Sequence, residues 1–245
     1  MHCEANAIEL QDLSYRYPDG TEALRDISVT LHHEQRVALL GPNGAGKSTL
    51  IAHLNGIIMA QQGTVLVEEV PLTLDTLATV RQRIGIVFQD PDNMLFMTNI
   101  ADDIAFGPRN LGLPEEEVQR RLARALALTG LEGLAHKPGM HLSFGQKKRA
   151  AIAAVLAMEP AVLVLDEPTS NLDPRGRHEM LDFTASLDVT LLVATHDLEA
   201  AWELCDRALV LDEGRLVADG DAHRIMRDRE LMLAHGLDVP LNAGE

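Results

Sequence analysis

The sequence has few cysteines, no long apolar run and a shortage of positive charge. Its two cysteines, Cys3 and Cys205, form neither a disulfide framework nor a metal-binding spacing, which favours a reducing compartment. The longest apolar run, Ala150 to Met158, falls far short of the roughly 20 residues that a membrane-spanning helix needs, so we expect no membrane span. The segment Met1 to Glu4 has neither a basic nor an apolar signal region, so we expect no export.

Positive charge is scarce, with 21 lysines and arginines against 37 acidic residues and a net charge of −16. Most of such a surface repels a nucleic-acid backbone, so we expect no nucleic-acid partner. The basic triplet Lys147-Lys148-Arg149 is predicted to be a solvated helix face. A site for a polyanion must therefore supply its own positive potential from backbone amides, a few cations and a metal.

No repeat, low-complexity tract or linker divides the chain, so we expect one α/β domain over residues 1–245. Apolar residues alternate over 13–17 and 27–31 around the turn sequence Pro18-Asp19-Gly20, which predicts an antiparallel hairpin. Continuous apolar runs, each followed by a loop and a helical stretch, predict buried parallel strands at 37–40, 161–165 and 191–194.

Between Phe88 and Ser143 the pattern becomes helical, and we expect an inserted helical lobe there. Pro114 followed by three glutamates at 115–117 is typical of a helix amino terminus, where the dipole favours negative charge. After the last predicted parallel strand we expect a hairpin over 207–220. A short helical tail from Asp221 to Leu237 then closes the domain.

One glycine-rich segment has the pattern of a phosphate-binding loop. It reads Gly41-Pro42-Asn43-Gly44-Ala45-Gly46-Lys47-Ser48-Thr49, matches GxxxxGK[ST], and lies between a predicted strand and a helix. The glycines let backbone N–H groups surround phosphates, Lys47 reaches the outer phosphates, and Ser48 offers its hydroxyl to Mg²⁺. An ordinary glycine-rich turn is disfavoured by this context, so we predict a nucleoside triphosphate site.

A second chemical feature is a pair of carboxylates at the end of the strand predicted over 161–165. Asp166 is predicted to hold hydrated Mg²⁺, and Glu167 to polarise the attacking water as a general base. The alternative is a polar strand end before the turn at Pro168. A phosphate loop in the same sheet favours the catalytic interpretation.

The segment Leu142-Ser143-Phe144-Gly145-Gln146, followed by the basic triplet, resembles the signature sequence of ATP-binding cassette (ABC) ATPases. The resemblance covers nearly the whole chain and implies a P-loop NTPase core with an antiparallel β subdomain. It also implies an inserted helical subdomain at about 90–158 and a C-terminal helical tail at about 221–245. By the same resemblance, Tyr17 joins the ATP-binding residues, Gln89 serves catalysis and Mg²⁺ binding, and His196 is a catalytic residue that contacts the γ-phosphate. The resemblance also implies that the ATP of the other subunit is contacted by the signature residues Ser143, Phe144, Gly145 and Gln146. A dimer loop is implied at Ser170, Asn171, Leu172 and Asp173.

The signature segment implies that the active unit contains two copies, so we expect a homodimer that binds two MgATP. Ser143 is predicted to cap a helix whose first turn faces an anion. Phe144 departs from the second glycine that is usual in the family, so its ring is expected to point away from phosphate. For His196, the alternative to a phosphate contact is an ordinary satisfied histidine.

Two further segments, Gln89–Phe96 and His141–Arg149, resemble energy-coupling-factor importers, especially those for cobalt and nickel. The resemblance implies a peripheral ATPase subunit at the cytoplasmic face of the inner membrane. Its partners are then a transmembrane coupling protein and a substrate-binding component. An importer for another substrate such as a vitamin, or an ABC ATPase that acts as an ATP-driven clamp outside transport, remains open.

Two other interpretations bear on function. A P-loop GTPase or kinase is disfavoured because no [NT]KxD sequence occurs and because the signature segment would then be unexplained.

Met94, Leu95 and Phe96 form an apolar segment that suits the helix of a membrane partner. Local core packing of these three side chains is the alternative.

Overall fold

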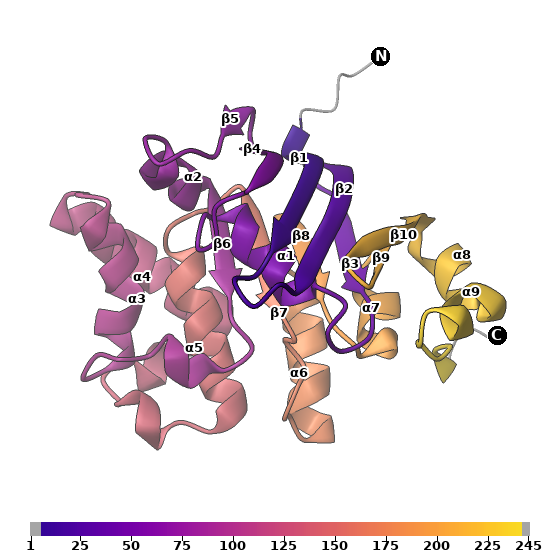
Figure 1. Cartoon of the computed structure of the whole chain (residues 1–245). Coiled ribbons are helices and arrows are strands. Elements are labelled where there is room, and N and C mark those ends of the chain that lie inside the picture. Colours follow the sequence, from indigo (N-terminus) through magenta and orange to yellow (C-terminus); the bar gives the residue numbers. More distant parts are fainter. Residues whose placement is uncertain (1–5, 242–245) are drawn as a thin grey trace, which may run out of the picture.

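The computed structural model describes residues 6–241, which form two β-sheets, one at the outside of the molecule and one between helices (Figure 1). Cys3, the segment Met1–Glu4 and the last four residues of the predicted tail, 242–245, lie outside the described residues. Within residues 6–241, no helix has the length and apolar character needed to cross a membrane.

The first sheet is antiparallel and has the strand order β2-β1-β4-β5. Its strands are β1 (Asn6–Arg16), β2 (Glu22–His32), β4 (Gln62–Val67) and β5 (Val70–Pro71). Leu13 of β1 pairs with Ile27 of β2, and both side chains are fully buried. The backbone N–H of Tyr17 donates to the carbonyl of Thr21 at 2.8 Å and closes the turn between the strands. The predicted hairpin is therefore confirmed.

The second sheet has the order β10-β9-β3-β8-β7-β6 and is parallel except for the edge strand β10. Its strands are β3 (Arg36–Leu40), β6 (Ile84–Val87), β7 (Val162–Asp166), β8 (Thr190–Ala194), β9 (Arg207–Asp212) and β10 (Arg215–Asp221). The three predicted parallel strands are the neighbours β3, β8 and β7. Ala194 pairs with Leu39 on one side and with Asp166 on the other, so the loops that follow these strands share one edge.

Helices cover both faces of the second sheet. They are α1 (Lys47–Leu54), α2 (Leu77–Arg83), α6 (Pro174–Ala185), α7 (Leu198–Leu204), α8 (Ala222–Arg227) and α9 (Arg229–Ala234). Helix α1 buries Ile51 and Leu54 in a core shared by the two sheets, whereas α6, α7 and α8 pack on the opposite face. The predicted tail consists of two helices, because Asp228 ends α8 and caps α9 by accepting a hydrogen bond from the N–H of Leu231.

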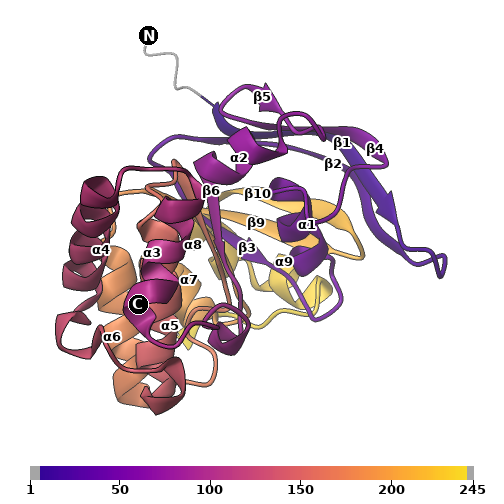
Figure 2. The same cartoon turned by 90° about the vertical axis from the view of Figure 1, so that its left-hand side faces the viewer.

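Three further helices form a lobe beside the second sheet: α3 (Ile100–Asn110), α4 (Glu115–Thr129) and α5 (Phe144–Leu156). They lie side by side (Figures 1 and 2), and Figure 1 shows them on the opposite side of the molecule from α8 and α9. Ile104, Leu126 and Ala150 belong to a separate hydrophobic core between them. Pro114 occupies the N-cap position of α4, which confirms the predicted start of this helix. Short 3₁₀ turns lie at Pro91–Asn93, Glu132–Leu134 and Gly139–His141.

Candidate active site

The phosphate-loop segment connects β3 to α1, and two of its glycines have no room for a side chain. Gly41 has a φ of 152°, and a Cβ there would lie 2.1 Å from the carbonyl oxygen of Leu211. Gly46 has a φ of 109°, and its Cβ would lie 2.5 Å from the carbonyl oxygen of Ala23. Glycine is therefore required at the start of the loop, after β3, and at its end, before α1. The first amides of α1 lack partners within the helix.

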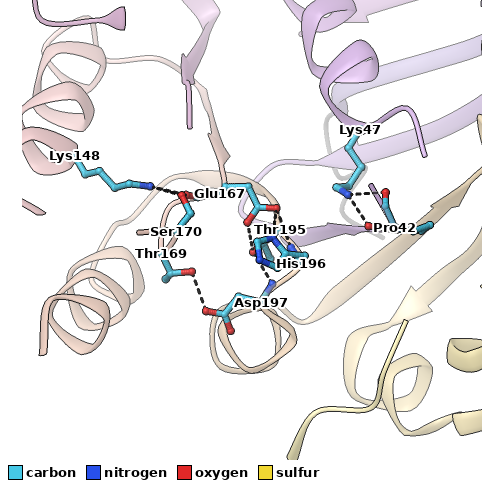
Figure 3. A network of polar contacts seen from close by, with 10 residues as sticks. Pro42, Lys47, Lys148, Glu167, Thr169, Ser170, Thr195, His196 and Asp197 are labelled. Atoms are coloured by element: carbon cyan, nitrogen blue, oxygen red, sulfur yellow. Dashed lines mark hydrogen bonds and ion pairs between the residues drawn. The ribbon is translucent and has the colours of Figure 1, made fainter. Parts of the chain in front are cut away.

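The side chain of Lys47 folds back over this loop. Its ammonium donates to the carbonyl of Gly41 at 2.5 Å and to that of Pro42 at 3.1 Å (Figure 3). Burial lowers the pKa of Lys47, while the negative charges of Glu167 and Asp166 act in the opposite direction. The loop therefore holds one cation at its centre, which suits an anionic ligand.

The pocket above the loop gathers side chains from distant parts of the sequence. Its walls are formed by Tyr17, Thr21, Glu22, Ala23, Asn43, Gly44, Ala45, Gly46, Lys47, Ser48, Thr49, Gln89, Asp166 and Glu167. Gly41 and Pro42 lie below it, where they accept the hydrogen bonds from Lys47. The predicted ATP-binding, Mg²⁺-binding and catalytic residues therefore surround one pocket, and His196 joins them through its contact with Glu167.

Tyr17 lies just beyond β1, on the wall of this pocket. Its hydroxyl is 3.0 Å from the hydroxyl of Thr49 in α1. Its ring meets the ring of Tyr15 edge to face, with the centroids 5.0 Å apart. Tyr15 makes a similar contact with His53 at 4.8 Å. These contacts hold the Tyr17 ring in place beside the phosphate loop.

Glu167 directly follows β7, and only 8% of its surface is exposed. Its carboxylate accepts hydrogen bonds from the hydroxyl of Thr195 at 3.0 Å and from the backbone N–H of His196 at 3.0 Å. The Nδ1 atom of His196 lies 2.7 Å from the same carboxylate oxygen as the backbone N–H (Figure 3). The residues after β8 therefore orient the carboxylate at the end of β7.

Asp166 precedes Glu167 and is half-buried at the same strand end. Burial raises the pKa of Asp166, and the neighbouring charge of Glu167 raises it further, whereas Lys47 and Lys148 act to lower it. Two carboxylates crowded in this way favour a bound cation. The carboxylate of Asp166, the amide oxygen of Gln89 and the hydroxyl of Ser48 are the oxygen ligands that Mg²⁺ prefers, and phosphate oxygens complete such sites. The donor set therefore fits Mg²⁺.

Asp197 anchors the segment that carries His196. Its carboxylate accepts two hydrogen bonds from Arg177 in α6, both at 2.8 Å, and one from the hydroxyl of Thr169 at 2.9 Å. It also caps α7 by accepting from the N–H of Ala200. Burial acts to raise the pKa of Asp197, but the hydrogen bonds from Arg177, Ala200 and Thr169 outweigh it and hold this pKa below its usual value.

The signature segment opens α5 with a capping box. The N–H of Gln146 donates to the hydroxyl of Ser143, and the N–H of Ser143 donates to the side-chain oxygen of Gln146 at 3.0 Å. The predicted N-cap is therefore confirmed, and the Ser-x-x-Gln spacing could have predicted the reciprocal bond. The signature residues line a hollow together with Asn171, Leu172 and Asp173 of the predicted dimer loop. Ser170, at the start of that loop, lies behind them and contacts Lys148.

The prediction of a solvated face for the basic triplet is wrong. Lys148 is only 4% exposed, and its ammonium donates to the backbone carbonyl of Glu167. Lys147 pairs with Asp92 at 2.7 Å, and Arg149 lies 3.6 Å from Glu179. The error has a physical cause, because α5 packs against β6, α6 and the 3₁₀ turn at Pro91–Asn93. Sequence spacing alone does not tell which polar groups of these segments, or of the turn after β7, meet the charges of the triplet.

The apolar segment Met94–Phe96 was predicted either to receive a partner helix or to pack in the core, and its residues do not all behave alike. Met94 packs against the core beneath the second sheet, and Leu95 packs against the core of the helical lobe. Phe96 is 63% exposed, and its ring meets the exposed ring of Phe106 edge to face, with the centroids 5.1 Å apart. Core packing therefore accounts for Met94 and Leu95, whereas Phe96 and its neighbour Met97 face outward.

Sequence reasoning missed several residues that shape the site. Thr195 and Asp197 flank the predicted His196, and the polar triplet that they form with it directly after a buried strand could have identified both residues. Arg177 and Lys148 gave no such signal, because each acts on a partner about 20 residues away.

Comparison with known proteins agrees with this geometry. A sequence profile of the ABC transporter family matches residues 24–170. A Streptomyces coelicolor protein, provisionally named as an ABC transporter ATP-binding protein, is 50% identical over 234 residues, which cover 96% of this chain and 90% of that protein. The energy-coupling factor transporter ATP-binding protein EcfA of Methanothermobacter thermautotrophicus is 46% identical over 241 residues, 96% of this chain and 78% of that protein.

Solved structures give the same result. The chain superposes on cbiO1 from Clostridium perfringens, part of the ABC transporter complex cbiONQ, with a TM-score of 0.84, 40% identity and 98% of each chain covered. It also superposes on the ATP-binding cassette MJ0796, a dimer in a post-hydrolysis state bound to ADP and Pi, with a TM-score of 0.78 and 26% identity. That match covers 88% of this chain and 98% of the other.

The fold and the pocket are those of a P-loop ATPase with a signature helix. The chain belongs to the ABC transporter family and is an ATP-binding, ATP-hydrolysing subunit of the ABC type, similar to those of energy-coupling-factor transporters.

Proposed function

We propose that this chain is the ATPase subunit of an energy-coupling-factor importer and that it powers the import of a transition metal ion, cobalt or nickel. In this proposal the active unit is a head-to-tail homodimer that binds two MgATP. Closure of the dimer on ATP, and its reopening after hydrolysis, move the membrane subunits.

The observation that carries the proposal is the separation of two groups of residues on one chain. Among residues 6–241, the walls of the nucleotide pocket include no residue of the signature segment, and the hollow at Ser143–Gln146 includes no residue of the phosphate loop. A second copy placed head to tail would supply to each site the part that it lacks. The dimeric state of the similar cassette MJ0796 supports this arrangement.

Each site then binds ATP through charge and stacking. The amides of the phosphate loop and the ammonium of Lys47 hold the phosphates, and the ring of Tyr17 stacks on the base. Ser48, Gln89 and Asp166 hold Mg²⁺, which neutralises phosphate charge when bound.

The remaining residues serve hydrolysis and the interface. Glu167 accepts the proton of the attacking water as general base. His196 holds the carboxylate of Glu167 on one side and reaches the γ-phosphate on the other. The signature residues Ser143–Gln146 contact the ATP of the second copy, and the loops at 170–173 of the two copies meet.

We further propose that the membrane partners dock at the outward-facing residues Phe96, Met97 and Phe106, which are 63%, 36% and 39% exposed. Aromatic anchors and a flexible methionine are typical of surfaces that receive a partner. The helical subdomain, residues about 90–158, carries this surface within a single nucleotide-binding domain, and residues about 221–245 form its tail. The subunit would then lie peripherally at the cytoplasmic face of the inner membrane.

The assignment to cobalt or nickel depends on the resemblance of Gln89–Phe96 and His141–Arg149 to importers of these ions. The similarity to EcfA and to cbiO1 supports the energy-coupling-factor class. Purification of the tagged chain from membranes, with mass spectrometry of its partners and analysis of bound metal, tests the assignment. Recovery of a coupling protein without cobalt or nickel would indicate another substrate, and recovery of ribosomes or DNA would indicate a clamp outside transport.

The catalytic part of the proposal is tested with Glu167→Gln. The amide keeps the size of the side chain but cannot act as a base, so the variant is expected to bind MgATP, to hydrolyse it far more slowly and to accumulate as a dimer. ATP hydrolysis and light scattering, each with and without Mg²⁺, measure these effects. Hydrolysis by the variant at the wild-type rate would place the base elsewhere.

A further inference from the structure

Lys148 is a buried cation that the proposed function does not use. It lies on α5, is only 4% exposed, and lines neither the nucleotide pocket nor the hollow at the signature segment. Lysine is almost never fully buried unless it is paired. Burial lowers the pKa of Lys148 to about 8, against the opposing charges of Glu167, Asp166 and Asp90. The side chain is therefore still mainly protonated at neutral pH, and its burial must be compensated by specific contacts.

Those contacts converge on the segment that carries the catalytic carboxylate. The ammonium of Lys148 donates to the backbone carbonyl of Glu167 at 2.6 Å and to the hydroxyl of Ser170 at 3.0 Å (Figure 3). The hydroxyl of Ser170 in turn donates to the same carbonyl at 2.9 Å. Two of the three donors of the ammonium are thus directed at the turn that follows β7.

The backbone of Glu167 needs such support. Its φ is 51°, a left-handed conformation that few residues other than glycine adopt and that costs about 1–3 kcal/mol unless its surroundings hold it. Its N–H donates to the carbonyl of Ala194 at 2.8 Å, and its carboxylate is held by Thr195 and His196. Lys148 holds the opposite side, the carbonyl, so both ends of the residue are fixed.

Lys148 also contacts the signature segment, at the start of α5. Lys148 lies one helical turn after Phe144, and its ammonium lies 5.6 Å from the centroid of the Phe144 ring. An aromatic face at this distance attracts a cation. The ring therefore covers the ammonium, which gives a physical reason for phenylalanine where the family usually has glycine.

We propose that Lys148 is a positioning residue that joins the signature end of α5 to the backbone of Glu167 in the same chain. Contact of α5 with the nucleotide of the second copy is thereby linked to the placement of Glu167 at the chain's own nucleotide. The inference rests on the proposed dimer and on the proposed role of Glu167 as base.

The test compares Lys148→Met, Lys148→Arg and the control Lys137→Met, which changes an exposed lysine in the loop before the signature segment. Steady-state hydrolysis gives kcat and KM, and calorimetry gives the Kd of MgATP. For Lys148→Met we expect kcat to fall by about 10- to 100-fold, the loss typical of a displaced catalytic group, with KM and Kd little changed. Lys148→Arg retains charge and donors and is expected to recover part of kcat, and Lys137→Met to match the wild type.

A wild-type kcat in Lys148→Met would overturn the inference. So would a parallel loss of kcat, nucleotide affinity and melting temperature in both Lys148 variants, because that pattern marks a purely structural role. If Lys148→Met does not fold, Ser170→Ala removes one acceptor of the ammonium and is expected to lower kcat without changing Kd; an unchanged kcat would then reject the inference. A wild-type protein that does not hydrolyse ATP would instead reject the proposed function.

Discussion

The Nδ1 atom of His196 lies 2.7 Å from the carboxylate of Glu167, although 28 residues separate them in the sequence. The contact follows from the sheet, because Asp166 and Ala194 are paired at the ends of two parallel strands and the next residues of each strand therefore meet. The backbone N–H of His196 donates to the same oxygen at 3.0 Å. Part of the orientation of Glu167 thus comes from the main chain and does not require an imidazole.

Replacing Lys47 with alanine is expected to remove tight ATP binding. The phosphate loop loses the cation that lies at its centre, and a hydrogen bond to a charged group contributes about 1.5–3 kcal/mol, which corresponds to a roughly 10- to 150-fold rise in Kd. Calorimetry with MgATP measures the change, with Lys137→Ala as the control. An unchanged Kd in Lys47→Ala would show that this side chain does not contact phosphate.

Tyr17→Ala is expected to weaken ATP binding by about 1–3 kcal/mol, the range for a base stacked on an aromatic ring. Tyr17→Trp keeps a stacking surface and is expected to keep the affinity. Tyr17→Phe loses only the hydroxyl that contacts Thr49 and serves as a second control. Equal Kd values for all four proteins would remove Tyr17 from the site.

Phe96→Asp separates partner docking from core packing. Because Phe96 is 63% exposed, we expect the melting temperature of the isolated subunit to stay close to the wild type, within the roughly 2–4 °C that about 1 kcal/mol represents. Pull-down of the membrane subunit is expected to fail, because the new charge would lie in the proposed apolar contact. Leu233→Asp, at a 54% exposed site on α9, is the matched control and is expected to keep the pull-down. A large melting loss in Phe96→Asp, or a normal pull-down, would contradict the docking surface.

Asp197→Asn tests the ion pair with Arg177 through its pH dependence. The folded-state pKa of Asp197 lies below its ordinary value of 3.8, so the unfolded chain binds more protons as the pH falls through this range. The contribution of the pair to stability is therefore complete at neutral pH and lost in strong acid. We expect the variant to melt below the wild type at pH 7 and the difference to narrow at acid pH, as measured by thermal unfolding. A difference that does not change with pH would mean that ionisation of Asp197 does not stabilise the fold.

The buried strands and the chemistry at their ends could be predicted from sequence, because both signals are local. A continuous apolar run marks β7, and the carboxylates follow it directly. The glycine pattern likewise predicted the loop before α1 from nine adjacent residues. A helix break such as the one at Asp228 was harder to predict, although aspartate is a common N-cap.

The surroundings of α5 could not be predicted in this way. Helical periodicity places Lys148 on a face of α5, but it does not say that the turn after β7 packs against that face. The environment of each residue in the apolar segment 94–96 could not be predicted either, because Met94 packs against one core, Leu95 packs against another and Phe96 faces solvent. Both outcomes depend on contacts between segments far apart in the sequence.

The capping box at the start of α5 has a consequence for assembly. Ser143 and Gln146 satisfy each other's backbone N–H groups within a single chain, so the first turn of the helix is already ordered before a second copy arrives. Ordering a residue's backbone costs about 1–2 kcal/mol of conformational entropy, and here that cost is met during folding. In the proposed homodimer, two copies would therefore associate by docking of preformed surfaces on this side of the interface, and the association rate would depend on rigid-body encounter rather than on loop folding.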